Sequence, residues 1–199
     1  MEKLSALTRT ELIGELLATI VAADDPHACQ VHDVESPNFG RPEAADERRE
    51  ALVAQRLAIA RELMLRDMRA KLASGPVMSS PQVLREWLVF HTAGLEHEVF
   101  IVLFLDVRMQ LLSVVEMFRG TLTQTTVYPR EIAKAALKRN AAAVVLAHNH
   151  PSGSAEPSAI DQHLTRIVKA ALDVLSVQVI DHYVVAGDRV VSLAERGLI

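Results

Sequence analysis

The stretch that decides the fold runs from Ala142 to Asp161 and reads A-A-V-V-L-A-H-N-H-P-S-G-S-A-E-P-S-A-I-D. Its first six residues are all apolar, which predicts a central strand that is buried on both faces of a sheet. The P-S-G segment that follows the histidines is typical of a turn. Pro157 and Ser158 then predict the start of a helix, with Ser158 as its N-cap.

Two histidines and an aspartate in this stretch predict a metal site. His148 and His150 are two residues apart at the end of the strand, so their rings point to the same face. Asp161 is at the third helical position, where the turn brings its carboxylate back over the histidines. Three protein ligands leave one position of a tetrahedral ion open, as in catalytic zinc sites. Two other interpretations stay open: a loop with two solvated histidines, and a structural zinc site.

A catalytic site of this kind also needs a group that accepts a proton from water. Glu98 is our candidate, because it precedes the apolar run Val99–Leu105, where an acid is unusual. Its position alone leaves open an ordinary charge at the edge of a strand. We expect Ser158 to lie beside the metal site.

The residues around this stretch predict an α/β domain from Pro76 onward. Apolar or β-branched runs predict further strands over residues 99–106, 111–118, 121–127, 177–180 and 183–186. Helical spacing and N-terminal prolines predict helices over residues 80–91, 129–139 and 158–175. We therefore expect a mixed sheet with helices packed against it.

The N-terminal region, residues 1–75, is predicted to be helical. A helix over residues 4–22 is followed by a linker over residues 24–45, which contains prolines and shows no period, and by a long amphipathic helix over residues 46–72. The apolar stripe of this long helix consists of Leu52, Leu57, Ala60, Met64, Met68 and Leu72. Such a stripe is buried either on the neighbouring domain, residues 76–199, or on a second copy of the chain, so a homo-oligomer is one expectation.

Composition excludes several classes of protein. Half of the 199 residues are hydrophobic and 23% are charged, which is a globular composition. Cys29 is the single cysteine, so neither an internal disulfide nor a cysteine-rich metal site is expected. The sequence begins without an apolar signal core, and its apolar runs are too short to cross a bilayer. We expect a soluble, cytoplasmic protein without a membrane partner.

The charge balance gives little support to nucleic acid as the main partner. The net charge is −4, whereas nucleic-acid-binding domains are usually basic. Arg130, Lys134 and Lys138 are four residues apart and line one face of the predicted helix over residues 129–139. They predict at most a weak DNA contact, and an ordinary solvated helix face is the interpretation that we favour.

The whole constellation resembles a known family. H-x-H, seven residues, then S-x-x-D is similar to the motif of the JAMM/MPN metalloprotease superfamily. More narrowly, H-N-H-P-S-G resembles the bacterial RadC family, together with F-R-G-T from Phe118, P-R-E from Pro129 and D-H-Y-V-V from Asp181. The resemblance covers residues 79–199. One departure is that no helix-hairpin-helix glycine turn is found in the N-terminal region.

The resemblance implies an MPN-type fold similar to the cytidine-deaminase layout, and one Zn²⁺ held by His148, His150 and Asp161. It implies that Glu98 holds and deprotonates the attacking water, and that Ser158 supports the oxyanion. The expected activity is therefore that of a zinc metallopeptidase that cleaves a peptide or isopeptide bond of an unidentified protein substrate. The alternative is a non-catalytic DNA-repair or replication-fork accessory module that keeps the metal for stability.

Overall fold

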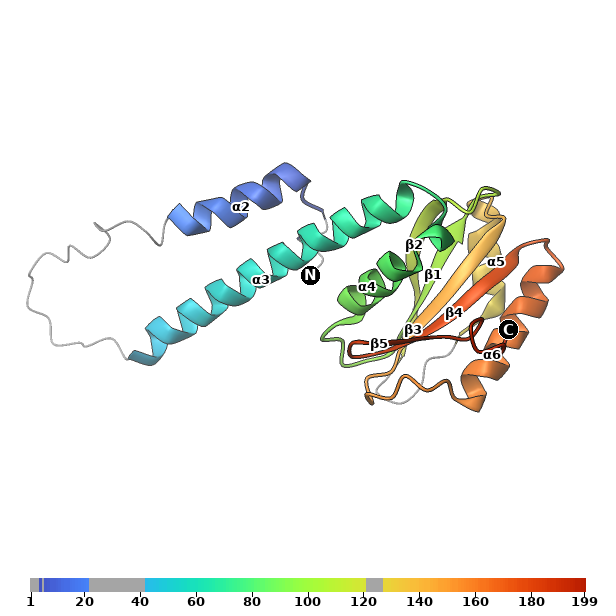
Figure 1. Ribbon diagram of the computed structural model, residues 1–199. Coiled ribbons are helices and arrows are strands. Elements are labelled where there is room, and N and C mark those ends of the chain that lie inside the picture. The colour runs from blue at the N-terminus through green and yellow to red at the C-terminus, as the bar shows by residue number, and fades with distance from the viewer. Residues whose placement is uncertain (1–3, 5, 22–41, 121–126) are drawn as a thin grey trace, which may run out of the picture. The chain divides into compact units, whose positions relative to one another are not determined.

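The computed structural model describes residue 4 and residues 6–21, 42–120 and 127–199. The chain divides into two compact units, Met1–Asp67 and Met68–Ile199. The predicted domain division at residues 75 and 76 stays a prediction. Figure 1 shows the elements of both units, of which the second holds the predicted metal site.

The second unit is built on a five-stranded sheet. Its strands are β1 (Val99–Leu105), β2 (Leu111–Arg119), β3 (Ala143–Asn149), β4 (Gln178–Ala186) and β5 (Arg189–Ser192), in the spatial order β2-β1-β3-β4-β5. The β3–β4 pair is parallel, and the other three pairs are antiparallel. The expectation of a mixed α/β sheet is therefore confirmed.

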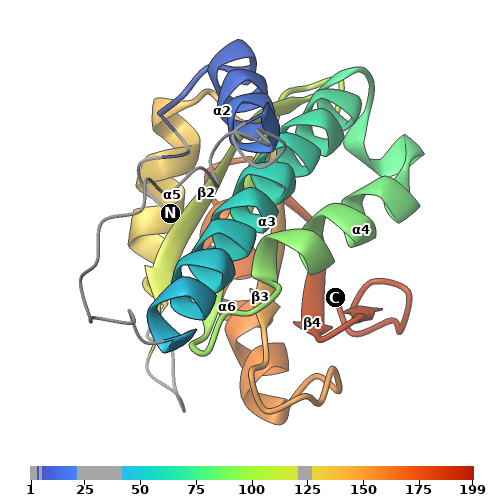
Figure 2. The ribbon, with the colours of Figure 1, turned by 90° about the vertical axis from the view of Figure 1, so that its left-hand side faces the viewer.

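Helices cover both faces of this sheet. After the short 3-10 turn η1 (Val77–Ser79), α4 (Pro81–Thr92) packs on one face, where it contacts β4 and β5. The opposite face carries α5 (Pro129–Lys138) and α6 (Ala159–Asp173), as Figures 1 and 2 show. Every residue of β1 and β3 is buried, which explains why their sequences are apolar throughout.

The core beneath α5 and α6 is aliphatic apart from two phenylalanines. Its buried members are Phe100, Val102, Phe104, Ile132, Ala136, Ala141, Val144, Leu146, Val168, Leu172, Val177 and Val179. In β1 and β3 these are the even-numbered residues, which share one face of the sheet. His148 continues this series, so its side chain emerges at the edge of the same core.

The prediction of two separate strands at residues 177–180 and 183–186 is wrong. One continuous strand, β4, replaces them, because Asp181 and His182 are buried within the sheet and hydrogen-bonded rather than placed in a turn. The strand that follows, β5, was also not predicted from the sequence. The two-residue loop that joins β4 to β5 begins with Gly187, whose φ of 60° suits a tight hairpin.

The first unit contains α2 (Arg9–Val21) and most of α3 (Pro42–Ala73), which continues into the second unit. The predicted linker ends too late, since residues 42–45 are already helical; residues 22–41 lie outside the described part of the chain. Thr8 caps α2 by accepting a hydrogen bond from the backbone N–H of Glu11 at 3.3 Å. This bond satisfies one of the backbone N–H groups in the first turn of the helix.

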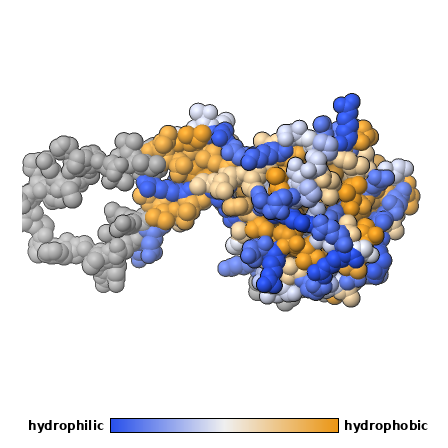
Figure 3. Space-filling model, viewed as in Figure 1, coloured by the Kyte–Doolittle hydropathy of each residue, from blue (hydrophilic) through white to orange (hydrophobic). Residues whose placement is uncertain are grey.

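The apolar stripe predicted on α3 is only partly buried. Leu72 is 1% exposed, but Leu57 is 66% exposed and Met64 is 47% exposed. Figure 3 shows apolar surface over the described parts of α2 and α3. The expectation of a homo-oligomer through this helix stays a prediction.

Two further expectations concern the rest of the chain. Of the strand predicted over residues 121–127, residues 121–126 lie outside the described part, and Val127 is not in a strand. Among the described residues, no helix is both long and apolar enough to span a membrane.

Candidate metal centre

The strand β3 delivers the two histidines. It ends two residues later than predicted, so His148 lies inside the strand, paired with Phe100 of β1. The backbone N–H of His150 donates to the carbonyl of Val185 at 2.7 Å, which continues the β3–β4 ladder past the end of the strand. Because side chains alternate along a strand, both histidine rings point to the face that carries α6.

The first turn of α6 delivers the aspartate. Ser158 is the N-cap, and its hydroxyl accepts a hydrogen bond from the backbone N–H of Asp161 at 3.1 Å. In return, Asp161 Oδ2 accepts from the backbone N–H and from the hydroxyl of Ser158, both at 2.7 Å. This capping box fixes the rotamer of Asp161 and leaves Oδ1 directed at the histidines.

Three potential ligand atoms converge. His148 Nε2 lies 2.9 Å from His150 Nε2 and 3.2 Å from Asp161 Oδ1. Among the described residues, these three side chains form the one group of histidine, cysteine or carboxylate residues that lie close enough to hold an ion. The side chains are only 7–13% exposed, so the site lies at the rim of the core and not in open solvent.

The electrostatics of the group keep Asp161 ionised. Burial raises the pKa of Asp161, but the hydrogen bonds with His148 and His150 outweigh it and hold this pKa far below its ordinary value. The hydrogen bond with Asp161 is also the main cause that raises the pKa of His150. An ionised carboxylate is the form that binds a metal ion.

The donor set fits zinc. Two imidazole nitrogens and one carboxylate oxygen are ligands that Zn²⁺ prefers, and a three-ligand set leaves a position for water or substrate. The second ring nitrogen of His150, Nδ1, donates to the carbonyl of Ser154 at 2.8 Å, so Nε2 is the nitrogen that faces the group and the one available to a metal. Zinc histidines characteristically have such a partner on the other nitrogen.

Glu98 lies next to this group. It immediately precedes β1 and is half-buried, and its carbonyl accepts from the backbone N–H of Gly120 at 2.8 Å. The hydrogen bond with Asp161 has the largest effect on the pKa of His150, and the negative charge of Glu98 raises this pKa further. The structure therefore places Ser158 in direct contact with one predicted ligand, and Glu98 close enough for its charge to act on another.

Three residues that support the site escaped sequence reasoning in whole or in part. His182 of β4 is fully buried, and its Nε2 lies 2.9 Å from His148 Nδ1. Its Nδ1 lies 2.7 Å from the hydroxyl of Thr165, which sits one helical turn after Asp161. Burial, and next the nearby His148, lower the pKa of His182 well below its ordinary value, so this ring is neutral. The sequence flagged His182 but left its role open.

Asn149 is the third such residue. Its side chain points to the other face of the sheet, where Oδ1 accepts from the backbone N–H of Val99 at 2.8 Å and Nδ2 donates to the carbonyl of His97 at 3.1 Å. These two backbone groups flank Glu98 in the chain. The middle residue of H-N-H thus fixes the segment that carries Glu98 against the segment that carries the histidines.

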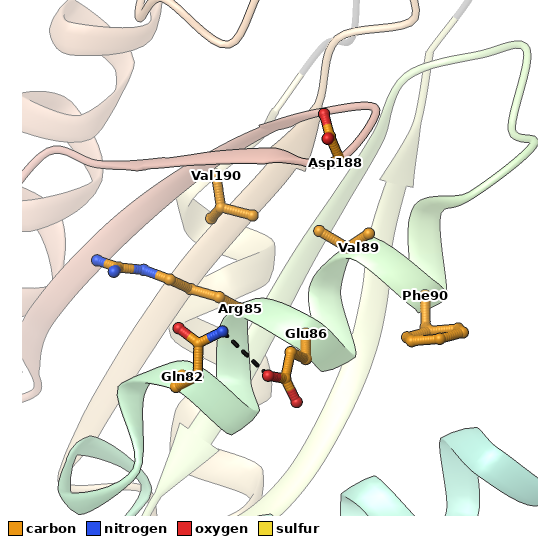
Figure 4. A pocket seen from close by; sticks show the side chains of 7 residues that line it. All are labelled: Gln82, Arg85, Glu86, Val89, Phe90, Asp188 and Val190. Carbon is orange, nitrogen blue, oxygen red and sulfur yellow. Dashed lines mark hydrogen bonds between the residues drawn. The ribbon is translucent and has the colours of Figure 1, made fainter.

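A shallow pocket of about 320 Å³ lies away from this chemistry. Residues of α4 form one wall, and Asp188 and Val190 of the β4–β5 hairpin form the other (Figure 4). Within it Gln82 donates to Glu86 at 3.0 Å. Since α4 covers the face of the sheet opposite α6, this pocket is not the metal site.

The basic residues of α5 are separate from the metal centre as well. The side chains of Arg130 and Lys134 are 81% and 79% exposed, and both are within 4 Å of Glu131, an acidic residue on the same helix. Arg130 also lies over the ring of Tyr128. This helix face is thus solvated and partly neutralised, and a DNA contact through it stays a prediction.

The fold and site define an MPN-type (JAB) α/β domain, with a group that could hold a metal ion at the end of a central strand. Comparison with known proteins gives the family: a model of the RadC-like JAB domain matches residues 78–198. The chain belongs to this family, as its sequence motifs predict.

Relatives of the same family support this assignment. A UPF0758 protein of Methylibium petroleiphilum is 54% identical over 143 residues, which are 72% of this chain and 64% of that protein. A UPF0758 protein of Leptothrix cholodnii is 54% identical over 138 residues, 69% of this chain and 62% of that protein. The matched part of the chain thus spans less than two thirds of the length of these relatives.

Proposed function

We propose that this protein is a zinc-dependent hydrolase that cleaves a peptide or isopeptide bond. The observation that carries the proposal is the convergence of His148 Nε2, His150 Nε2 and Asp161 Oδ1 beside Glu98. A metal ion that only stabilised the fold would not require an additional carboxylate, that of Glu98, near its three ligands. The substrate class rests on the resemblance to the JAMM/MPN superfamily.

The residues divide the chemistry between them. A zinc ion held by the three ligands would polarise the scissile carbonyl and acidify a water molecule. Glu98 accepts the proton of the attacking water and returns it to the leaving amine. Because Glu98 is not one of the ligands, its role is proton transfer rather than metal binding.

Ser158 has a double role in this proposal. Its hydroxyl proton is directed at Asp161 Oδ2, so Ser158 holds a ligand before any substrate is bound. Support of the oxyanion requires the hydroxyl to rotate from Asp161 toward the substrate. Replacement of Ser158 by alanine is therefore expected to weaken metal binding as well as turnover.

The test is a zinc analysis of the purified protein, followed by incubation with a panel of peptide and isopeptide substrates. The wild type should hold about one zinc ion per chain, as a three-ligand site predicts. Glu98→Gln should keep the zinc and lose turnover by about 10²-fold or more, the usual contribution of a general base. Glu96→Gln, at an exposed acid two residues away, is the matched control and should match the wild type.

Two outcomes would contradict the proposal. If the wild type holds no zinc, the ligand assignment is wrong. If zinc is bound but Glu98→Gln turns over as fast as Glu96→Gln, Glu98 is not the base. Zinc binding without hydrolysis of any substrate in the panel would favour the accessory-module alternative.

A further inference from the structure

A chain of hydrogen bonds runs behind the metal-binding group and joins two of its members. It starts at Asp161, whose backbone carbonyl accepts from the Thr165 hydroxyl at 2.6 Å. It continues from Thr165 Oγ1 to His182 Nδ1 over 2.7 Å, and from His182 Nε2 to His148 Nδ1 over 2.9 Å. Thr165 is 1% exposed and His182 is fully buried, so both are shielded from bulk water.

The position of each proton in this chain follows from the carbonyl at its start. A carbonyl oxygen only accepts, so the single hydroxyl proton of Thr165 lies toward Asp161. Toward His182 the hydroxyl oxygen must then act as acceptor, and His182 Nδ1 must carry a proton. A neutral imidazole has one N–H, so His182 Nε2 is bare and accepts from His148.

The same reasoning fixes the tautomer of His148. Its Nδ1 carries the proton that His182 accepts, which leaves the lone pair of Nε2 directed at His150 and Asp161. His150 reaches the same state by a shorter route, because its Nδ1 donates directly to the carbonyl of Ser154. Both histidines therefore direct Nε2 at the site, and in the neutral rings that bind a metal the remaining proton of each lies on Nδ1, held directly or through His182 and Thr165 by a backbone carbonyl.

We propose that Thr165 and His182 are positioning residues that fix the tautomer and the ring orientation of His148, and thereby set the affinity of the site for its metal. This inference rests on the proposed metal site but not on the proposed hydrolysis. The chain begins at the backbone of Asp161, so the placement of one ligand also controls the protonation of another.

A purely structural role makes a different prediction. His182 also packs edge-on against Phe100, with ring centroids 5.5 Å apart, so its removal would disturb the core. The Thr165 hydroxyl separates the two roles, because Thr165→Val keeps the shape of the side chain and removes only its oxygen. Without that oxygen, His182 Nδ1 loses its acceptor and both tautomers of His182, and hence of His148, become accessible.

The experiment uses the full chain in two measurements. Zinc affinity is measured by competition with a chromophoric chelator, and ring tautomers are read from long-range ¹⁵N–¹H spectra of the metal-free protein. Thr92→Val is the matched control: Thr92 is buried in α4 and bonds the carbonyl of Leu88, one turn back, at 2.9 Å. Thr165→Ser restores the hydroxyl and serves as the rescue.

We expect Thr165→Val to weaken zinc binding by about 10-fold or more, the usual effect of losing a partner of a metal ligand. Thr165→Ser and Thr92→Val should bind zinc within about 3-fold of the wild type, well below that usual effect. The wild type should show His148 protonated at Nδ1 and His182 protonated at Nδ1, and Thr165→Val should lose the single tautomer.

Three results would count against the ideas separately. If wild-type His148 carries no proton at Nδ1 in the metal-free protein, the proton assignment is wrong. If Thr165→Val binds zinc as tightly as Thr92→Val, the positioning role is wrong while the metal site stands. If the wild type fails to bind zinc although its tautomers are as assigned, the metal site itself is wrong, and the role in metal affinity falls with it.

Discussion

Asn149 shows how one side chain can determine the geometry of a site without facing it. Its amide bonds both backbone groups that flank Glu98, at 2.8 and 3.1 Å, and it is 4% exposed. The backbone ladder between β1 and β3 ends at the pair Phe100 and His148, and the two hydrogen bonds of Asn149 continue the pairing of the two segments beyond it. The spacing between Glu98 and the two histidines therefore depends on this amide.

Asn149→Ala should lower the free energy of unfolding by about 1–3 kcal/mol, since it leaves a buried N–H and a buried carbonyl unpaired. Urea unfolding followed by the fluorescence of Trp87, the single tryptophan, measures this loss. Gln82→Ala is the control: Gln82 is exposed, and its loss should cost less than about 0.5 kcal/mol. Equal effects of the two variants would show that Asn149 does not hold the strand ends together.

The ligands and their supports differ in how far the sequence predicts them. His148, His150 and Asp161 lie within 14 residues, so strand alternation and a helix cap place them together. Thr165 and His182 meet only because α6 packs beside β4, and nothing in the residues between them encodes that contact. The role of Asn149 was hidden for the same reason, since its partners precede it by about 50 residues.

At the level of elements, errors arose where polar residues lie inside the sheet. Asp181 is 2% exposed in the middle of β4, and its carboxylate accepts from the Ser192 hydroxyl and from the backbone N–H groups of His182 and Ala194. Two of these partners, Ser192 and Ala194, come from β5 and the turn after it. A polar residue without visible partners favours a loop, so the sequence predicted a break in a strand that tertiary contacts keep intact.

The packing of α4 on the sheet contains a pair that responds to pH. His91 of α4 stacks on Trp87 and bonds Glu116 of β2 at 3.0 Å. This hydrogen bond is the main cause that lowers the pKa of Glu116 below its ordinary value of 4.5. A lowered carboxyl pKa stabilises the fold at pH values above 4.5, and that contribution is lost as the pH falls through the lower folded-state value.

Glu116→Gln should therefore reduce the loss of stability that the wild type shows as the pH falls below neutral. Urea midpoints, measured from Trp87 fluorescence between pH 3 and pH 7, should differ between variant and wild type near neutral pH and converge in acid. Glu86→Gln, on the exposed side of α4, is the control and should keep the wild-type profile. A constant offset of Glu116→Gln at all pH values would assign its effect to packing rather than ionisation.

The basic face of α5 leads to a prediction about DNA. Three cations release few counterions, and Glu131 partly neutralises two of them. Binding to duplex DNA should be weak, with a slope of log K against log salt no steeper than about −3. Removing Arg130, Lys134 and Lys138 together should abolish it, whereas Arg108→Ala should not. Tight binding that is insensitive to salt would point to residues outside this helix.

For the whole molecule, the decisive feature is that α3 belongs to both compact units. The second unit begins at Met68, so the last turn of α3 is part of it. There Leu72 is 1% exposed and the Arg69 guanidinium lies over Trp87, 6.0 Å from the ring centroid. A domain boundary drawn at the Ser74-Gly75-Pro76 break, as composition favours, separates these two residues from the unit that they stabilise.

Two truncations test this division. A fragment of residues 68–199 should be soluble, folded and able to bind zinc, because all ligands and their hydrogen-bonding partners lie within it. A fragment of residues 74–199 should unfold at a lower urea concentration. Its free energy of unfolding should be lower by about 1.5–3 kcal/mol, the cost of losing one buried leucine. Since the three predicted ligands lie on the face of the sheet opposite α4, both fragments should keep the same zinc affinity.

Size-exclusion chromatography of the full chain beside the 68–199 fragment completes the test. Leu57 and Met64 of the first unit are exposed, so an oligomer that appears only in the full chain would locate its interface in that unit. For the stability comparison of the two fragments, Leu112→Ala is the control, because it removes an exposed leucine of β2 instead of the buried Leu72. If the 68–199 fragment aggregates or fails to bind zinc, the second unit is not self-sufficient. If the two fragments are equally stable, Leu72 and Arg69 contribute nothing to that unit.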